Sequence, residues 1–210
     1  MTVMLSVLRR HGATLGERHG RRVPVNFGSV ATEEAVCRSS VGLVERSDRA
    51  MLEIRGRADD VDWAVGQLAA LRDHAWWLRV SEHRAIVRCE GDDEDACVAA
   101  MRRAEDVAIV DIAASHAALD LVGPLADAVL LASSIEQEWD VIVVRRDAAC
   151  VELLVSRAHG PALWNRLLEA GEGFDIACVG VDATEHLDVA GHLRGPRRSE
   201  RAPVPLAPPE

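Results

Sequence analysis

The residues best suited to metal or acid–base chemistry are scattered along this chain of 210 residues rather than gathered in one motif. Eight histidines are present, but no two stand beside a carboxylate at the spacing that places metal ligands on one helix. The acidic run at residues 92–95 lacks the alternating acids and the closing glutamate of a calcium loop. Because acids favour the N-terminal turn of a helix, we interpret this run as a helix start and predict no metal site.

Nucleophilic and phosphate-binding motifs are also missing from the sequence. It contains no Gly-x-Ser-x-Gly elbow, no P-loop and no Gly-x-Gly-x-x-Gly turn. Its cysteines are odd in number and form no Cys-x-x-Cys pair: Cys37, Cys89, Cys97, Cys150 and Cys178. This pattern predicts buried or free thiols in a reducing cytosol rather than a disulfide framework or a zinc site.

Two other features suit binding. Trp76 and Trp77 are adjacent on a predicted strand, so their side chains must face opposite sides. We expect one indole in the core. The other either packs against its neighbours without a binding role, lines a pocket or anchors a partner protein. Glu152 alternates with the apolar Val151 and Leu153 and should point away from the helix-covered face, either into a central cavity or into solvent.

The elements that must position these side chains follow a repeated order. Apolar periodicity predicts strands at residues 51–56, 75–81, 84–90 and 106–113, with helices at 57–71 and 92–103. Their order is β-α-β-β-α-β, which is a split βαβ unit. The same order returns with strands at 117–123, 140–146, 150–156 and 175–181 and helices at 124–132 and 160–171.

The two copies are also in register, since Leu52, Glu53, Ile54 and Gly56 recur as Leu119, Asp120, Leu121 and Gly123. We therefore predict an α+β fold made of two pseudo-symmetric ferredoxin-like halves, about 44–114 and 115–181. A helix at 32–39, with Thr32 as its N-cap, should precede the first half, and residues 41–44 should turn the chain into the first strand.

Composition limits the partners. The net charge of −10 argues against nucleic-acid binding, which needs a basic face, and favours a basic protein partner. The sequence shows no leader-like start and no apolar run of about 18 residues, so we expect a cytoplasmic protein that does not span a membrane. The Pro- and Arg-rich residues 195–210 predict a disordered tail.

Several stretches resemble the glycine-cleavage T-protein (aminomethyltransferase) family. The first are HGRRVPVNFG at residues 19–28, EEAVCRSSVGLVERS at 33–47 and LEIRG at 52–56. The later ones are ELLVSRAHGPALWNRLLEAG at 152–171 and IACVGVDATEHL at 176–187. Residues 76–123 are more similar to the gamma subunit of heterotetrameric sarcosine oxidase, a relative with a similar fold.

The resemblance implies a duplicated ferredoxin-like fold that binds tetrahydrofolate, the acceptor of a one-carbon unit from an aminomethyl donor. A pterin needs a carboxylate to accept its two neighbouring N–H groups. The resemblance leaves Glu45 and Glu152 as candidates for that role and adds Phe27 and Ser47 to the folate-binding set. Arg88, Arg145 and Arg146 are available for the acidic tail of a folate.

The departures from the family concern its chemistry. The Gly-rich turn that carries the catalytic aspartate has no counterpart between Leu71 and Trp76. The folate-contacting glutamate of the family falls on Ala148, and both arginines of a later signature are lost at residues 183–190. The C-terminal β-domain typical of the family is not found after Gly195. We therefore assign no catalytic residue and expect no aminomethyl transfer by the isolated chain.

Two functions remain open at this point. One is a compact T-protein-like module that binds a reduced folate between its halves, near Phe27, Glu45, Ser47 and Glu152. The other is a non-catalytic partner subunit, with Trp76 or Trp77 as the interface anchor. Fold alone does not decide between them.

Overall fold

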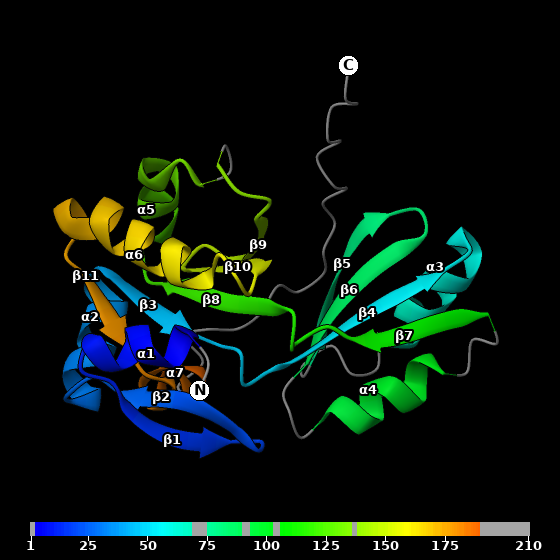
Figure 1. The fold of residues 1–210 in the computed structure, drawn as a ribbon, viewed down its shortest axis with the longest axis horizontal. Helices are drawn as coiled ribbons and strands as arrows, with labels where there is room; N and C mark the ends of the chain where they lie inside the picture. Colours follow the sequence, from blue (N-terminus) through cyan, green and yellow to red (C-terminus); the bar gives the residue numbers. More distant parts are fainter. Residues whose placement is uncertain (1–2, 69–74, 90–92, 103–105, 136–137, 190–210) are drawn as a thin grey trace. The chain divides into compact units, whose positions relative to one another are not determined.

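The computed structural model describes residues 3–68, 75–89, 93–102, 106–135 and 138–189, and these form two compact units. Unit 1 combines Met1–Ala50 with Ile112–Arg194, and unit 2 contains Met51–Asp111 (Figure 1). The protein is α+β, as predicted. The predicted tail at 195–210 lies outside the described residues. In the described part of the chain, no helix is long and apolar enough to cross a membrane.

Unit 2 has the ferredoxin-like arrangement. Its elements are β4 (Ala50–Gly56), α3 (Ala58–Gln67), β5 (Ala75–Ser81), β6 (Arg84–Cys89), α4 (Glu94–Met101) and β7 (Val107–Asp111). The strands form an antiparallel sheet in the order β5-β6-β4-β7. In this order β4 and β7, the first and last strands of the unit, are neighbours. Apolar residues at helical spacing, Val61, Ala64 and Val65, are buried on α3.

Unit 1 repeats this arrangement with one additional strand. Its elements are β8 (His116–Val122), α5 (Ala126–Ser133), β9 (Ile142–Asp147), β10 (Cys150–Ser156), α6 (Gly160–Gly171) and β11 (Ile176–Val179). The sheet order is β11-β3-β8-β10-β9, so β3 (Val41–Glu45) separates the first and last strands of the repeat. It runs parallel to β11 and antiparallel to β8.

The position of β3 corrects the prediction that residues 41–44 turn the chain into the first strand. They form a fully buried strand, and they pair with strands of the second repeat instead. Both repeats nevertheless begin as predicted, at β4 and at β8. The exact halves, 44–114 and 115–181, stay a prediction.

The other elements of unit 1 come from the two ends of the chain. They are α1 (Val3–Arg10), β1 (Thr14–Arg18), β2 (Arg21–Asn26), α2 (Val30–Ser39) and α7 (Val181–Val189). Helix α2 begins at Val30, not at Thr32, and its N-cap residue Ser29 makes no side-chain cap hydrogen bond. Instead, Glu33 is buried and accepts hydrogen bonds from two other segments, which fixes the position of this helix end.

The sheet of unit 1 buries a different cluster on each face. On one face Leu43, Leu119 and Leu153 pack in the larger cluster with residues of α1, α5 and α6. On the opposite face Val44, Val122 and Cys150 pack with β2, α2, β11 and α7. Neighbouring residues of a strand point to opposite faces, so these two sets also tell which face any other residue of the sheet occupies.

Candidate functional site

Two acidic side chains face each other on the sheet of unit 1. Asp120 of β8 lies directly opposite Glu152 of β10 in the antiparallel register, and Val44 of β3 flanks Asp120 on its other side. This is the face of the smaller cluster, away from α5 and α6. Glu152 is fully buried and Asp120 is 3% exposed. Burial of two like charges at this spacing is costly unless protons, cations or hydrogen-bond donors compensate for it.

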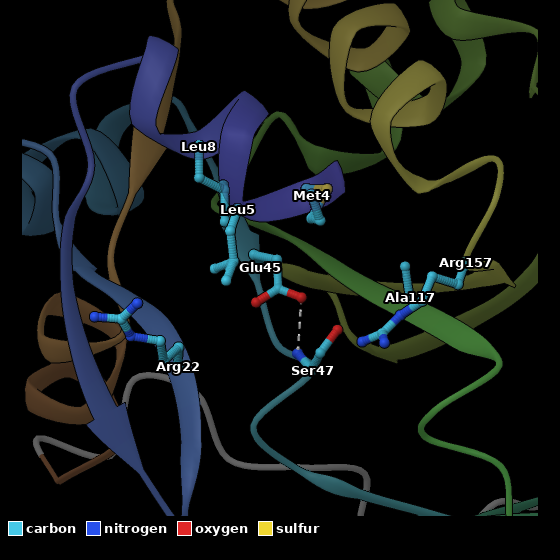
Figure 2. A pocket seen from close by; sticks show the side chains of 8 residues that line it. All are labelled: Met4, Leu5, Leu8, Arg22, Glu45, Ser47, Ala117 and Arg157. Atoms are coloured by element: carbon cyan, nitrogen blue, oxygen red, sulfur yellow. Dashed lines mark hydrogen bonds between the residues drawn. The ribbon is translucent and has the colours of Figure 1, made fainter. Parts of the chain in front are cut away.

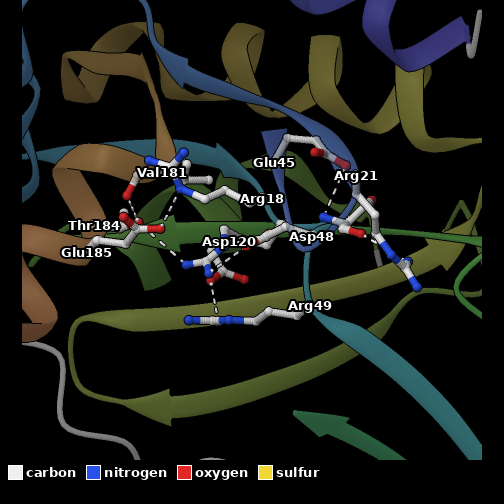
Figure 3. A network of polar contacts seen from close by, with 11 residues as sticks. Arg18, Arg21, Glu45, Asp48, Arg49, Asp120, Val181, Thr184 and Glu185 are labelled. Carbon is white, nitrogen blue, oxygen red and sulfur yellow. Dashed lines mark hydrogen bonds and ion pairs between the residues drawn. The ribbon is translucent and has the colours of Figure 1, made fainter. Parts of the chain in front are cut away.

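For Asp120, the compensation by the described residues is incomplete. Arg49 reaches Asp120 with 3.4 Å between Nη1 and Oδ2, whereas Oδ1 has no hydrogen-bond partner among the described residues (Figure 3). Burial, and then the charge of Glu152, raise the pKa of Asp120 from 3.8 to about 6, although nearby arginines oppose this shift. Burial and the Asp120 charge likewise raise the pKa of the Cys150 thiol on the same face. The site therefore has spare capacity to accept hydrogen bonds.

Further basic groups belong to the same network. Arg46 binds both carboxylate oxygens of Asp48, at 3.0 and 3.1 Å, and all but a few per cent of both side chains is buried. It also approaches Thr184 of α7, whose hydroxyl donates to the Val181 carbonyl. A buried, bidentate guanidinium of this kind is rigid and keeps the loop after β3 in place.

Glu45 and Ser47 line a separate cavity beneath α1. Its wall includes the apolar Met4, Leu5 and Leu8, together with the rim arginines Arg22 and Arg157 (Figure 2). Glu45 is buried, and the Ser47 backbone N–H donates to its Oε1 at 3.2 Å. The cavity has a volume of about 40 Å³, which suits a few water molecules rather than a pterin, because ligand pockets measure roughly 300 Å³ or more.

The structure therefore does not bring the two candidate glutamates together. Glu45 pairs with Leu119, and the next residue along β8, Asp120, pairs with Glu152. Adjacent residues of a strand face opposite ways, so Glu45 and Glu152 occupy opposite faces of one sheet. Glu45 and Ser47 form one group, and Glu152 forms another with Asp120.

Phe27 contributes to packing in this structure. Its ring stacks on the buried Trp164 of α6, with 6.2 Å between ring centroids. Its backbone N–H donates to Glu33 Oε1 at 2.7 Å, while the other oxygen of Glu33 accepts from the Gly180 N–H at 2.8 Å. Phe27 thus belongs to a structural connection between α2, the end of β2 and the start of α7.

The predicted interface tryptophans lie on β5 of unit 2 and are both half-buried. Trp77 pairs with the buried Val87, and Trp76 pairs with Arg88, so the two indoles face opposite sides as expected. The indole of Trp63 on α3 is 43% exposed and is more accessible than either. Trp63 was not among the predicted site residues, although its position among three aspartates on a helix could have indicated it.

Asp120, Arg46 and Arg49 were also missed as site residues. The signal for Asp120 was present in the internal repeat, where it corresponds to Glu53. Glu53 is likewise fully buried in the first strand of its unit, and it pairs with Arg55 and Arg84. Acids are rarely buried without a partner, so an acid at the same strand position in both copies could have indicated a site residue.

Comparison with solved structures identifies the fold. The chain superimposes on the glycine cleavage system aminomethyltransferase T from Bartonella henselae with a TM-score of 0.69 and 20% sequence identity, over 87% of this chain. It also matches a chain of heterotetrameric sarcosine oxidase from Corynebacterium sp. U-96, with a TM-score of 0.54 and 18% identity over 76% of this chain. No protein-family model and no curated protein sequence matches.

These matches differ in how much of the other protein they cover. The chain spans 60% of the aminomethyltransferase but 98% of the sarcosine oxidase chain. At these identities the comparison shows a shared fold, which is the T-protein-like arrangement expected from the sequence.

Proposed function

We propose that the chain is a T-protein-like one-carbon module that binds a reduced folate through the Asp120–Glu152 pair and has no aminomethyl transfer of its own. The observation that carries the proposal is the Asp120 Oδ1 atom, which is buried and has no donor among the described residues. Such an atom costs free energy unless a ligand or water supplies an N–H or O–H group.

The chemistry of a pterin matches this requirement. A pterin offers neighbouring N–H donors to a carboxylate, and Asp120 and Glu152 provide two carboxyl groups side by side on one face. Both side chains are buried on the face that β2, α2 and α7 cover, so binding requires this cover to open. Arg49 lies within ion-pair distance of Asp120 and helps to hold it in place. This assignment keeps Glu152 from the predicted folate-binding set and adds Asp120, whereas Glu45 and Ser47 line the cavity of about 40 Å³ on the other face.

The test is calorimetric titration of the purified protein with tetrahydrofolate. We expect saturable binding that Glu152→Gln weakens by at least about tenfold, since a hydrogen bond to a charged group contributes about 1.5–3 kcal/mol. Glu45→Gln is the matched control, because it makes the same change on the opposite face and should leave the affinity unchanged.

Equal affinity for the parent and Glu152→Gln would exclude the carboxylate pair as the folate site. A parallel turnover assay with tetrahydrofolate and amine donors should give no methylene-tetrahydrofolate above background. Turnover by the isolated chain would contradict the second part of the proposal.

A second candidate is a non-catalytic subunit of a larger enzyme. It is favoured by the coverage of 98% of a chain from a heterotetrameric sarcosine oxidase. The net charge of −10 suits a basic partner surface through electrostatic steering. Native mass spectrometry of the protein isolated at its natural abundance should then show a stoichiometric complex with a second polypeptide. A mass of this chain alone, together with folate binding, would favour the first candidate.

A further inference from the structure

The cavity beneath α1 brings charges of both signs together. Glu45, which is 4% exposed, lies within it, with the apolar side chains of α1 on one side and Ser47 on the other (Figure 2). The exposed side chains of Arg22 and Arg157 line the same cavity from two other segments. One buried anion and two cations at the surface therefore share a single small space.

We propose that this cavity binds a small zwitterionic amino acid, with its ammonium group on Glu45 and its carboxylate between Arg22 and Arg157. An ion pair is stronger where little water competes, and a guanidinium matches the geometry of a carboxylate. A simple anion would be repelled by Glu45, and a simple cation by the arginines. The cavity lies on the sheet face opposite the Asp120–Glu152 pair, so this site is independent of folate binding.

Both arginines are available to a ligand. No described residue forms a hydrogen bond or an ion pair with either guanidinium, although Glu17 lies opposite Arg22 in the β1–β2 register. Arg157 follows β10, and its backbone N–H donates to the Ser115 carbonyl at 2.8 Å, which fixes the start of its side chain. The two guanidinium groups can therefore turn to a bound carboxylate without breaking an existing ion pair.

The anionic end of the cavity is held by the backbone. Glu45 is the last residue of β3 and pairs with Leu119 of β8. The Ser47 N–H donates to Glu45 Oε1 at 3.2 Å, and the Ser47 carbonyl accepts from Arg21 Nη1 at 3.2 Å. A carboxylate can accept about four hydrogen bonds, so an ammonium group can join the donors already present. Because the acceptor is already in place, less ordering is needed on binding.

The size of the cavity limits the ligand. A volume of about 40 Å³ leaves room for about three water-sized groups, since each needs roughly 10–15 Å³. This admits an ammonium group, a methylene and the near part of a carboxylate. The wall formed by α1 is apolar, with Met4, Leu5 and Leu8. A long side chain on the ligand would collide with this wall, so we expect amino acids of the size of glycine or alanine.

The experiment is an NMR titration of the ¹⁵N-labelled full chain with glycine, following the backbone amides of Ser47 and Arg157. We expect saturable shifts at both positions, weaker binding of L-alanine and none of L-leucine. Methylammonium and acetate, which each carry one of the two charges, should bind at least about tenfold more weakly than glycine.

Three outcomes would overturn the proposal. Acetate that binds as tightly as glycine would mean an anion site on the arginines alone. L-Leucine that binds as tightly as glycine would contradict the apolar size limit. Shifts that do not saturate with glycine would mean that the cavity holds water only.

Variants test the role of each charge. Arg157→Gln should weaken glycine binding at least about tenfold and leave methylammonium binding unchanged, because only the carboxylate loses a partner. Arg57→Gln, at an exposed position of unit 2, is the matched control and should change neither. Glu45→Gln should weaken both ligands. If Glu45→Gln does not fold, judged by circular dichroism, Arg157→Gln decides, and an unchanged glycine affinity in that variant would contradict the proposal.

Discussion

Asp120 and Glu152 show how one residue pair can link stability to ligand chemistry. Their side chains share one face of a sheet, and Arg49 pairs with one carboxylate oxygen of Asp120. Glu53, at the corresponding position of the other repeat, pairs with Arg55 and Arg84 instead. The two copies thus retain a buried acid at one place, but only Asp120 leaves an acceptor oxygen open among the described residues.

This arrangement predicts a specific dependence of stability on pH. The pKa of Asp120 in the folded protein, about 6, lies above its ordinary value of 3.8, so the folded state holds the proton more tightly. The contribution of the protonated Asp120 to the free energy of unfolding is complete below about pH 4 and is lost as the pH rises through 6. From the shift in pKa, the loss amounts to about 3 kcal/mol.

The measurement is urea unfolding of the parent and Asp120→Asn between pH 4 and pH 7. The variant does not titrate at this position, so the parent should lose about 3 kcal/mol relative to it across this range. Asp127→Asn, at an exposed position of α5, controls for the chemical change itself. A difference between parent and Asp120→Asn that does not vary with pH would show that Asp120 ionises normally.

At the scale of elements, Glu33 of α2 connects segments that are distant in sequence. One carboxylate oxygen accepts from the Phe27 N–H after β2, and the other accepts from the Gly180 N–H between β11 and α7. The approach is close here, since a Cβ on Gly180 would lie 2.1 Å from the Val25 carbonyl oxygen. The carboxylate therefore joins the N-terminal strands to the C-terminal helix.

Glu33→Gln should accordingly destabilise unit 1. A glutamine amide has one acceptor oxygen and turns its NH₂ group toward one of the two N–H donors, of which that of Gly180 is buried, and this costs about 1–3 kcal/mol. Glu34→Gln is the control, because this neighbour pairs only at the surface with Arg38 and His186 and should have a smaller effect. Urea unfolding measures both variants, and equal effects would contradict a special role for Glu33.

Local pattern predicted most elements of the two repeats. Strands 75–81 and 150–156 and the helix at 160–171 begin and end where the sequence placed them, because alternation, helical spacing and flanking turn residues are local signals. The elements α1, β1, β2 and α7 were not predicted.

The site was less predictable for a geometric reason. The alternation of apolar residues shows that neighbours on one strand face opposite ways. It does not show whether two residues on different strands lie on the same face of the sheet. Only the register of β3, β8 and β10 reveals that Glu45 and Glu152 lie on opposite faces. That register pairs residues that are far apart in sequence, and the local sequence pattern does not predict it.

At the scale of the whole molecule, unit 2 is an insertion within unit 1. Its first and last strands are hydrogen-bonded neighbours, with Leu52 opposite Asp111. The chain therefore enters and leaves unit 2 at nearly the same place, which is the geometry that permits one compact unit to be inserted in another. Unit 1, by contrast, is made from two separated stretches of chain.

The parallel pairing of β3 with β11 has a consequence for the order in which the protein forms during its synthesis. Val44 and its partner Val179 are separated by most of the chain, so the sheet of unit 1 cannot be completed until β11 has left the ribosome. The contiguous residues of unit 2 can fold earlier, because their contacts close shorter loops. Pulse-labelled hydrogen exchange during refolding should then protect the amides of β4 and β6 before those of β3 and β11. Simultaneous protection of the four strands would instead mean that the two units fold as one cooperative body.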